Sequence, residues 1–204
     1  MAAAQAAGVL SGGLVFSSVI PYAIRTYQRK IEPVPTTWFL WTLIGLAVLL
    51  TYRSSGAEAN IWPALFGFIN PALIMMLSVC RRGRWRRPTA PERFCFFVGV
   101  ASLAMWIFLR RHPNLVQYAL YLALAADISA AIPTIVFVWN QPDRDRPLAW
   151  VMFAVGYFVA VFAIPRNTFA NWVVPVYMTS VALVVAFPLA LHRLRRKIPL
   201  SQWA

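Results

Sequence analysis

The chain has 204 residues, of which 60% are apolar and 12% charged, and its formal net charge is +13. Soluble domains carry roughly a quarter charged residues, so this composition excludes a soluble globular protein. The basic residues stand at the ends of apolar stretches and not on one face of a folded domain, which argues against nucleic acid as a partner.

Seven apolar stretches are long enough, at about 20 residues each, to cross a bilayer. Each must be a helix, because a lone strand in lipid leaves its backbone groups without hydrogen bonds. The sequence therefore predicts an all-α membrane protein with seven transmembrane helices. We expect them, in chain order, at residues 8–27, 37–53, 61–80, 94–109, 115–139, 147–165 and 171–192.

The basic residues are distributed very unequally between the two sides of this arrangement. When the loops are assigned alternately, the side that holds the N-terminus carries 4 of the 19 Lys and Arg residues, and the other side carries 15. Positive residues stay in the cytoplasm, so we expect the N-terminus outside and the C-terminus in the cytoplasm. The basic loop Arg81–Arg87 also predicts contact with anionic lipid head groups.

An internal repeat is visible at an offset of 112 residues. Residues 20–38 then lie over residues 132–150, with Pro21 on Pro133 and tryptophan on tryptophan at the end of the segment. After a slip of one residue, Asn60 aligns with Asn171, Gly45 with Gly156 and Phe66 with Tyr177.

The repeat predicts how the chain is organised. We expect residues 1–80 to form a first three-helix repeat, 81–112 a basic cytoplasmic loop and a linker helix, and 113–204 a second three-helix repeat with a basic tail. One linker span between two blocks of three returns the second block in the same orientation. This is a parallel repeat, related by an axis along the membrane normal.

This 3+1+3 plan, with a proline low in the first helix of each repeat, resembles the SWEET/PQ-loop superfamily of transporters. The family's signature is a Pro-Gln pair, whereas Tyr22 follows Pro21 and Thr134 follows Pro133 here, so the chain resembles a diverged member. The resemblance implies two three-helix bundles around a central pathway that opens alternately to either side. It implies transport of a small polar solute, such as a sugar. The vitamin-importing PnuC transporters share the plan and are kept as an alternative.

The two aligned prolines are the first candidate functional residues. A proline inside a helix removes one backbone hydrogen bond and clashes with the preceding turn, so Pro21 and Pro133 each predict a kink. The resemblance implies a hinge that closes the cytoplasmic side; a static bend is the alternative.

A polar pocket is expected near the middle of the membrane. Asn70 lies about nine residues into its span, and an amide in hydrocarbon costs several kcal/mol unless it is paired. In SWEET transporters an asparagine on the third helix of each repeat binds substrate, which Asn70 matches, while the second repeat offers Thr179 and Ser180. The alternative for Asn70 is a hydrogen bond between helices with no ligand.

Asp127 is the only acidic residue within an expected span. Carboxylates inside membranes are functional candidates by default and usually face a cavity or a partner. Asp127 therefore predicts a group that carries a proton or accepts a hydrogen bond from the solute. The structural alternative is a carboxyl bonded to Ser17, Ser18 or Ser129.

The family resemblance also implies an aromatic residue that stacks on the solute. Trp41, about one turn deeper than the tryptophans at the membrane interface, is the residue expected in this role, with Tyr157 as its counterpart in the second repeat.

No catalytic pattern is present, so we expect no enzyme, no metal and no cofactor. His112 and His192 lie at span ends on opposite sides, with no acid clustered around either. An opsin is disfavoured because Lys30 and Lys197 lie at or beyond span ends, where neither could hold retinal.

A receptor on the same fold, like the KDEL-retrieval receptors, is the main rival interpretation. Such receptors hold a carboxylate, so a basic pocket would favour a receptor, whereas the expected pocket is acidic or neutral.

The presence of 17 Arg against 2 Lys indicates a GC-rich genome and so a bacterial inner membrane. Solute and lipids are the expected partners, and assembly as a homo-oligomer stays open.

Overall fold

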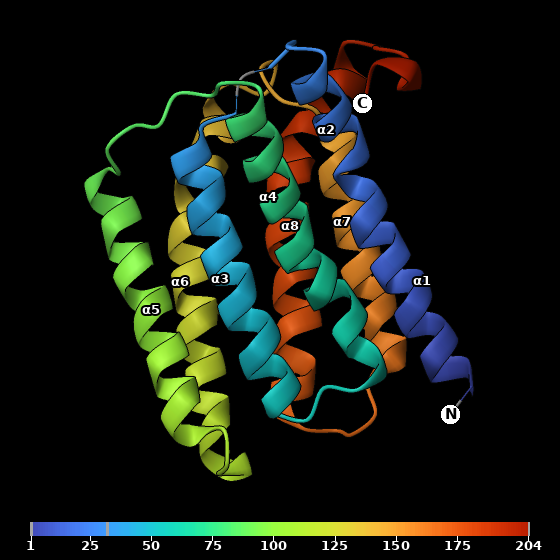
Figure 1. Cartoon of the computed structure of the whole chain (residues 1–204). Helices are drawn as coiled ribbons and strands as arrows, with labels where there is room; N and C mark the ends of the chain where they lie inside the picture. Colours follow the sequence, from blue (N-terminus) through green and yellow to red (C-terminus); the bar gives the residue numbers. More distant parts are fainter. Residues whose placement is uncertain (1, 32, 204) are drawn as a thin grey trace.

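The structure is a computed structural model that describes residues 2–31 and 33–203 (Figure 1). Its described residues form helices and connecting loops, without strands, which confirms the all-α prediction. The α-helices are α1 Ala2–Ser18, α2 Ile20–Tyr27, α3 Pro35–Ser54, α4 Trp62–Cys80, α5 Ala90–Leu109, α6 Pro113–Asn140, α7 Pro147–Ala160 and α8 Phe169–Arg195. Short 3-10 helices cover Ala59–Ile61, Val161–Ala163 and Leu200–Gln202.

Among the described residues, six helical segments are long and apolar enough to cross a membrane, which is compatible with an integral membrane protein. They are α1 with α2, α3, α4 with its preceding 3-10 turn, α5, α6 and α8. The seventh expected span, 147–165, is a shorter apolar helix that ends at Ala163. It stops there because Ile164 precedes Pro165 and is extended, as the residue before a proline prefers. Its length is still about 27 Å, close to the ~30 Å of a hydrocarbon core.

Proline and a capping box fix where several helices begin. Pro35 and Pro147, which the repeat aligns, both occupy the first turn of a helix, where a missing N–H costs nothing. Thr89 and Glu92 form a capping box at the start of α5. The Glu92 carboxylate also pairs with Arg86 of the preceding loop at 2.6 Å.

The helices pack in the same order in the two halves of the chain. In the first half α4 lies between α1 and α3, and in the second half α8 lies between α6 and α7. The halves meet mainly through two contacts, α1 against α7 and α3 against α6. The remaining helix, α5, packs on the edge formed by α3 and α6 and keeps most of its surface exposed (Figure 1).

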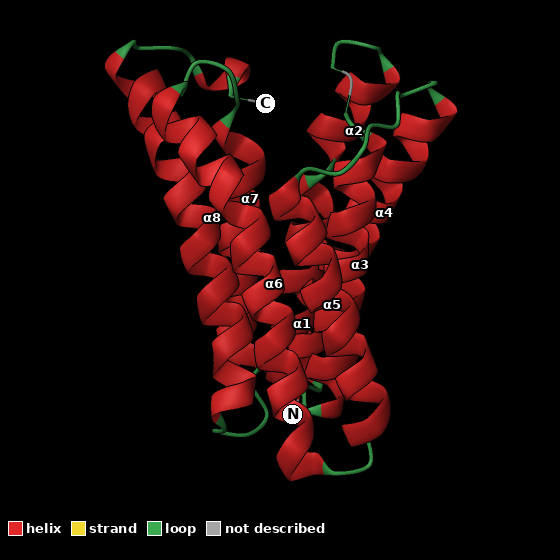
Figure 2. Cartoon of the chain, turned by 90° about the vertical axis from the view of Figure 1, so that its left-hand side faces the viewer, coloured by secondary structure: helices red, strands yellow, loops and turns green. Residues whose placement is uncertain are grey.

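The loops alternate between two ends of the bundle. The loop after α2, the α4–α5 loop, the α6–α7 loop and the C-terminal segment lie at one end, which we call the basic end (Figure 1). The N-terminus and the other three loops lie at the opposite, N-terminal end. Figure 2 shows that the helices converge toward the N-terminal end and diverge toward the basic end.

Candidate functional site

The first apolar segment is broken at Val19, between α1 and α2. The cause is Pro21, whose ring clashes with the preceding turn and which has no N–H to continue the helix. At the break, the Val19 N–H donates to the Phe16 carbonyl at 3.2 Å, three residues back. In a regular α-helix it would bond to Val15, so the Val15 carbonyl is released. The kink predicted at Pro21 is therefore present as a local break at Val19, whose own backbone stays in the α-helical region.

Asn70, on the neighbouring helix α4, donates a hydrogen bond to this released carbonyl. Its Nδ2 donates to the Val15 carbonyl at 2.7 Å, and the Ser18 hydroxyl donates to the same oxygen at 2.7 Å. The Asn70 side chain is 6% exposed, and its Oδ1 has no hydrogen-bond partner among the described residues. The amide nitrogen thus makes the bond between helices that was the alternative interpretation, whereas the amide oxygen is buried and unpaired.

Pro133 behaves differently from Pro21. Helix α6 runs without interruption from Pro113 to Asn140 and includes Pro133 within it. The Pro133 side chain is exposed, while Pro21 is half-buried. The two aligned prolines therefore have different effects, and only the first divides its helix.

Asp127 is buried on α6 and is bonded to α8. The Tyr177 hydroxyl donates to Asp127 Oδ2 at 2.7 Å. The serine partners that the sequence suggested are wrong, because Ser17, Ser18 and Ser129 each donate to a carbonyl of their own helix. Such bonds, three or four residues back, are what a serine inside a helix makes most readily. Sequence reasoning missed Tyr177, although the repeat had drawn attention to its position.

The other residues expected to bind solute have separate surroundings. Tyr157 is fully buried and its hydroxyl donates to the Pro63 carbonyl at 3.1 Å. Thr179 has a buried hydroxyl without a partner among the described residues. Ser180 is exposed and donates to a carbonyl within α8, and Trp41 is half-buried on α3.

A buried polar network joins helices at the N-terminal end of the bundle. Asn60, just before α4, donates through Nδ2 to Asn171 Oδ1 at 3.2 Å, in the first turn of α8. Tyr52 of α3 donates to the Asn171 carbonyl at 3.0 Å, and Asn60 Nδ2 also donates to the Tyr52 hydroxyl. All three side chains are at most 1% exposed. Asn60 and Asn171 are the aligned pair of the repeat, yet sequence analysis did not anticipate that they bond to each other.

Helices α1 and α7 approach closely at Gly156. The Ser11 hydroxyl donates to the Gly156 carbonyl at 2.7 Å. A Cβ at position 156 would lie 2.6 Å from the Val15 side chain and 3.1 Å from the Ser11 carbonyl oxygen. Small residues allow such close backbone approach between helices in membranes.

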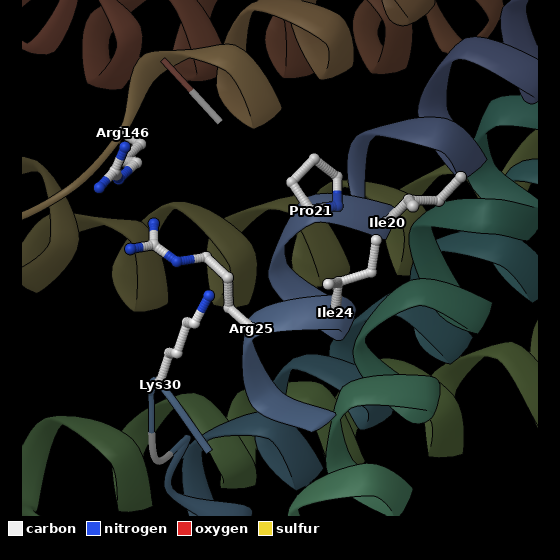
Figure 3. Close-up of a pocket in the computed structure, with 6 residues that line it drawn as sticks. All are labelled: Ile20, Pro21, Ile24, Arg25, Lys30 and Arg146. Carbon is white, nitrogen blue, oxygen red and sulfur yellow. The ribbon is translucent and has the colours of Figure 1, made fainter. Parts of the chain in front are cut away.

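The basic end contains a cavity of about 420 Å³, shown in Figure 3. Three apolar residues and three cationic residues line it, namely Ile20, Pro21, Ile24, Arg25, Lys30 and Arg146. Of the residues that sequence analysis selected, only the hinge residue Pro21 takes part. A pocket that is acidic or neutral was expected near the membrane midplane, whereas this one is cationic and lies at the basic end.

Comparisons with known proteins do not assign the chain to a family. Among the described residues, no group of three or more His, Cys, Asp or Glu side chains is arranged to hold a metal ion. No protein-family model, no curated protein and no solved structure matches the chain.

Proposed function

We propose that this protein is a SWEET-like membrane transporter that moves a small polar solute by alternating access. In this proposal residues 1–80 and 113–204 are parallel three-helix repeats, and α5 is the linker helix between them. The shorter α7 completes the count of seven spans. The N-terminal end faces outward and the basic end faces the cytoplasm, in a bacterial inner membrane.

The packing of the helices supports the repeat. In both halves the third helix lies between the first and the second. A two-fold relation between the halves would turn the contact between α1 and α7 into one between α6 and α3, and both contacts are present. Such pairs of equivalent interfaces are what a parallel repeat around an axis along the membrane normal produces.

One observation carries the transport proposal: buried hydrogen bonds join the helices at one end of the bundle, whereas the other end has an open cavity. Asn60, Asn171 and Tyr52 form a buried network at the N-terminal end. At the basic end the helices diverge (Figure 2), and an open cavity lies beside Pro21 (Figure 3). A carrier that opens to one side at a time requires such an asymmetric state.

Between the two ends lie the polar groups that we assign to the solute. Asn70 Oδ1 and the Thr179 hydroxyl are buried and have no partner in the part of the chain that the structure describes, and Asp127 is bonded to Tyr177. A solute hydroxyl could satisfy these groups in place of water. Trp41, Tyr157 and Ser180 complete the proposed binding residues. Pro21 and Pro133 are the proposed hinges.

A ligand-binding receptor on the same fold is the second candidate function. The observation that favours it is the cationic lining of the cavity at the basic end. A receptor binds its ligand without releasing it on the other side, so it predicts saturable binding with no uptake. A vitamin transporter of the PnuC type predicts uptake of a vitamin and none of sugars.

The test is solute uptake into liposomes that contain the purified protein, screened over sugars, vitamins and amino acids. We expect saturable uptake, lowered about tenfold or more by Asn70→Ala, which removes an amide that contacts the solute, and by Asp127→Asn, which replaces the carboxyl group by an amide that carries neither its charge nor its proton. Asn167→Ala, which alters an exposed asparagine at the N-terminal end, is the matched control and should transport normally. Absence of uptake for every solute would refute the transporter, and uptake unchanged in both variants would refute the binding residues.

A further inference from the structure

The cavity at the basic end combines an apolar wall with a group of cationic side chains. Ile20, Pro21 and Ile24 come from α2, Arg25 and Lys30 follow them along the chain, and Arg146 comes from the α6–α7 loop. Figure 3 shows the three cationic ends gathered on one side of the cavity and the apolar residues on the other. No acidic residue is among the described residues that line it.

The positive charge around the cavity is neutralised only in part. Burial, together with the nearby charges of Arg25 and Arg193, lowers the pKa of Arg146 from its ordinary value, and the Asp145 carboxylate offsets this lowering without reversing it. Asp145, the acidic neighbour of Arg146, already has other partners. Its Oδ1 accepts the Arg146 backbone N–H at 2.7 Å, and its Oδ2 accepts the Trp150 indole N–H at 3.2 Å. An anion bound between Arg25 and Arg146 would relieve the part of their repulsion that Asp145 does not offset.

We propose that this cavity binds a phosphate group, held by Arg25, Lys30 and Arg146. Guanidinium groups match phosphate oxygens in geometry and bind them through paired, charge-assisted hydrogen bonds. A dianion also balances three cations better than a single carboxylate does. The apolar wall accommodates an organic substituent next to the phosphate, and the volume of about 420 Å³ is within the range of small-molecule sites.

The two arginines come from different halves of the chain, so a ligand that binds both of them connects the two halves. Arg25 lies in the last turn of α2, the helix that follows the break at Val19, and Arg146 precedes α7. Nη1 of Arg146 is held by the Gln202 carbonyl at 2.5 Å, which leaves its other N–H groups for a ligand. A phosphate bound to both arginines links α2 to the second half of the bundle at the end where the helices diverge.

Phosphate of this kind has two sources, a free phosphate-bearing solute or the head group of an anionic lipid. Both present the same oxygens to the same arginines. They differ in that a lipid competes from within the bilayer, whereas a solute arrives from water.

The experiment measures binding of phenyl phosphate to the full-length protein in phosphatidylcholine nanodiscs by calorimetry. We expect saturable binding that weakens about tenfold or more in the Arg25→Gln/Arg146→Gln variant, because charge-assisted hydrogen bonds are lost. Arg144→Gln, an exposed arginine of the same loop that does not line the cavity, is the matched control. Arg146→Lys keeps the positive charge but loses the paired hydrogen bonds of a guanidinium group, so this variant should bind phenyl phosphate with intermediate affinity. It replaces the double variant in the comparison if the double variant does not fold.

Equal affinity in the native and double-variant proteins, or no binding of phenyl phosphate to the native protein, would overturn the proposal. A second set of nanodiscs containing phosphatidylglycerol identifies the source. Weaker phenyl phosphate binding there supports the site and assigns it to lipid, while unchanged binding supports it and assigns it to a solute. Binding at this site without uptake of any solute would sustain the phosphate site and refute the transporter.

Discussion

Replacing Asn60 by alanine should weaken the closed N-terminal end measurably. The side chain is fully buried and makes three hydrogen bonds. Its Oδ1 accepts the Glu58 N–H at 2.9 Å, and its Nδ2 donates to Asn171 Oδ1 and to the Tyr52 hydroxyl. At a net 0.5–1.5 kcal/mol each, three bonds are worth roughly 3 kcal/mol. Tyr52 and Asn171 still bond to each other afterwards, so we expect a loss of about 2 kcal/mol.

The assay is unfolding of the purified protein in detergent, titrated with sodium dodecyl sulfate and followed by thiol labelling. Cys95 is buried and reports unfolding, and Cys80→Ser removes the exposed thiol. Asn60→Ala combined with Asn171→Ala should show a coupling of about 0.6 kcal/mol or more, since the two amides bond directly. A loss below about 0.5 kcal/mol in the single variant, or strict additivity in the double one, would refute this account of the network.

Two further predictions concern the break between α1 and α2 and the close contact between α1 and α7. Pro21→Ala should restore a continuous helix across the break, which would raise the thermal midpoint and slow solute uptake, measured in the same liposomes. Pro133→Ala changes the second proposed hinge, which lies inside the uninterrupted helix α6, and should slow uptake less than Pro21→Ala does. Gly156→Ala places a Cβ 2.6 Å from Val15 and should cost about 1–3 kcal/mol of unfolding free energy. Gly13→Ala meets no atom within 4 Å and should be neutral, so an equal effect of the two alanines would contradict the close contact.

The helices were predictable because their signal is local. Apolar length alone identified six segments that the structure also makes long and apolar, and the proline rule located the break near Pro21. The stretch at 147–165 was overestimated because hydropathy does not register that Pro165 forces the preceding residue out of the helix.

The contacts between helices were not predictable in the same way. Whether Asp127 meets a serine or Tyr177 depends on the rotation of α6 against α8, which hydropathy does not determine. The repeat aligned Asn60 with Asn171 as equivalent positions, but only the three-dimensional arrangement shows that equivalent residues near the interface touch each other. The cationic cavity was not predicted, because the sequence analysis used its arginines only to decide which end of the protein faces the cytoplasm.

The C-terminal segment has a practical consequence for anyone handling this protein. The Gln202 carbonyl accepts hydrogen bonds from Arg146 and from the buried Arg193, and the Trp203 carbonyl accepts the Leu148 N–H. Gln202 and Trp203 thus hold Arg146 and the first turn of α7 in place through these hydrogen bonds. An affinity tag fused next to these two residues could break the bonds and displace Arg146, so a purification tag is better placed at the N-terminus.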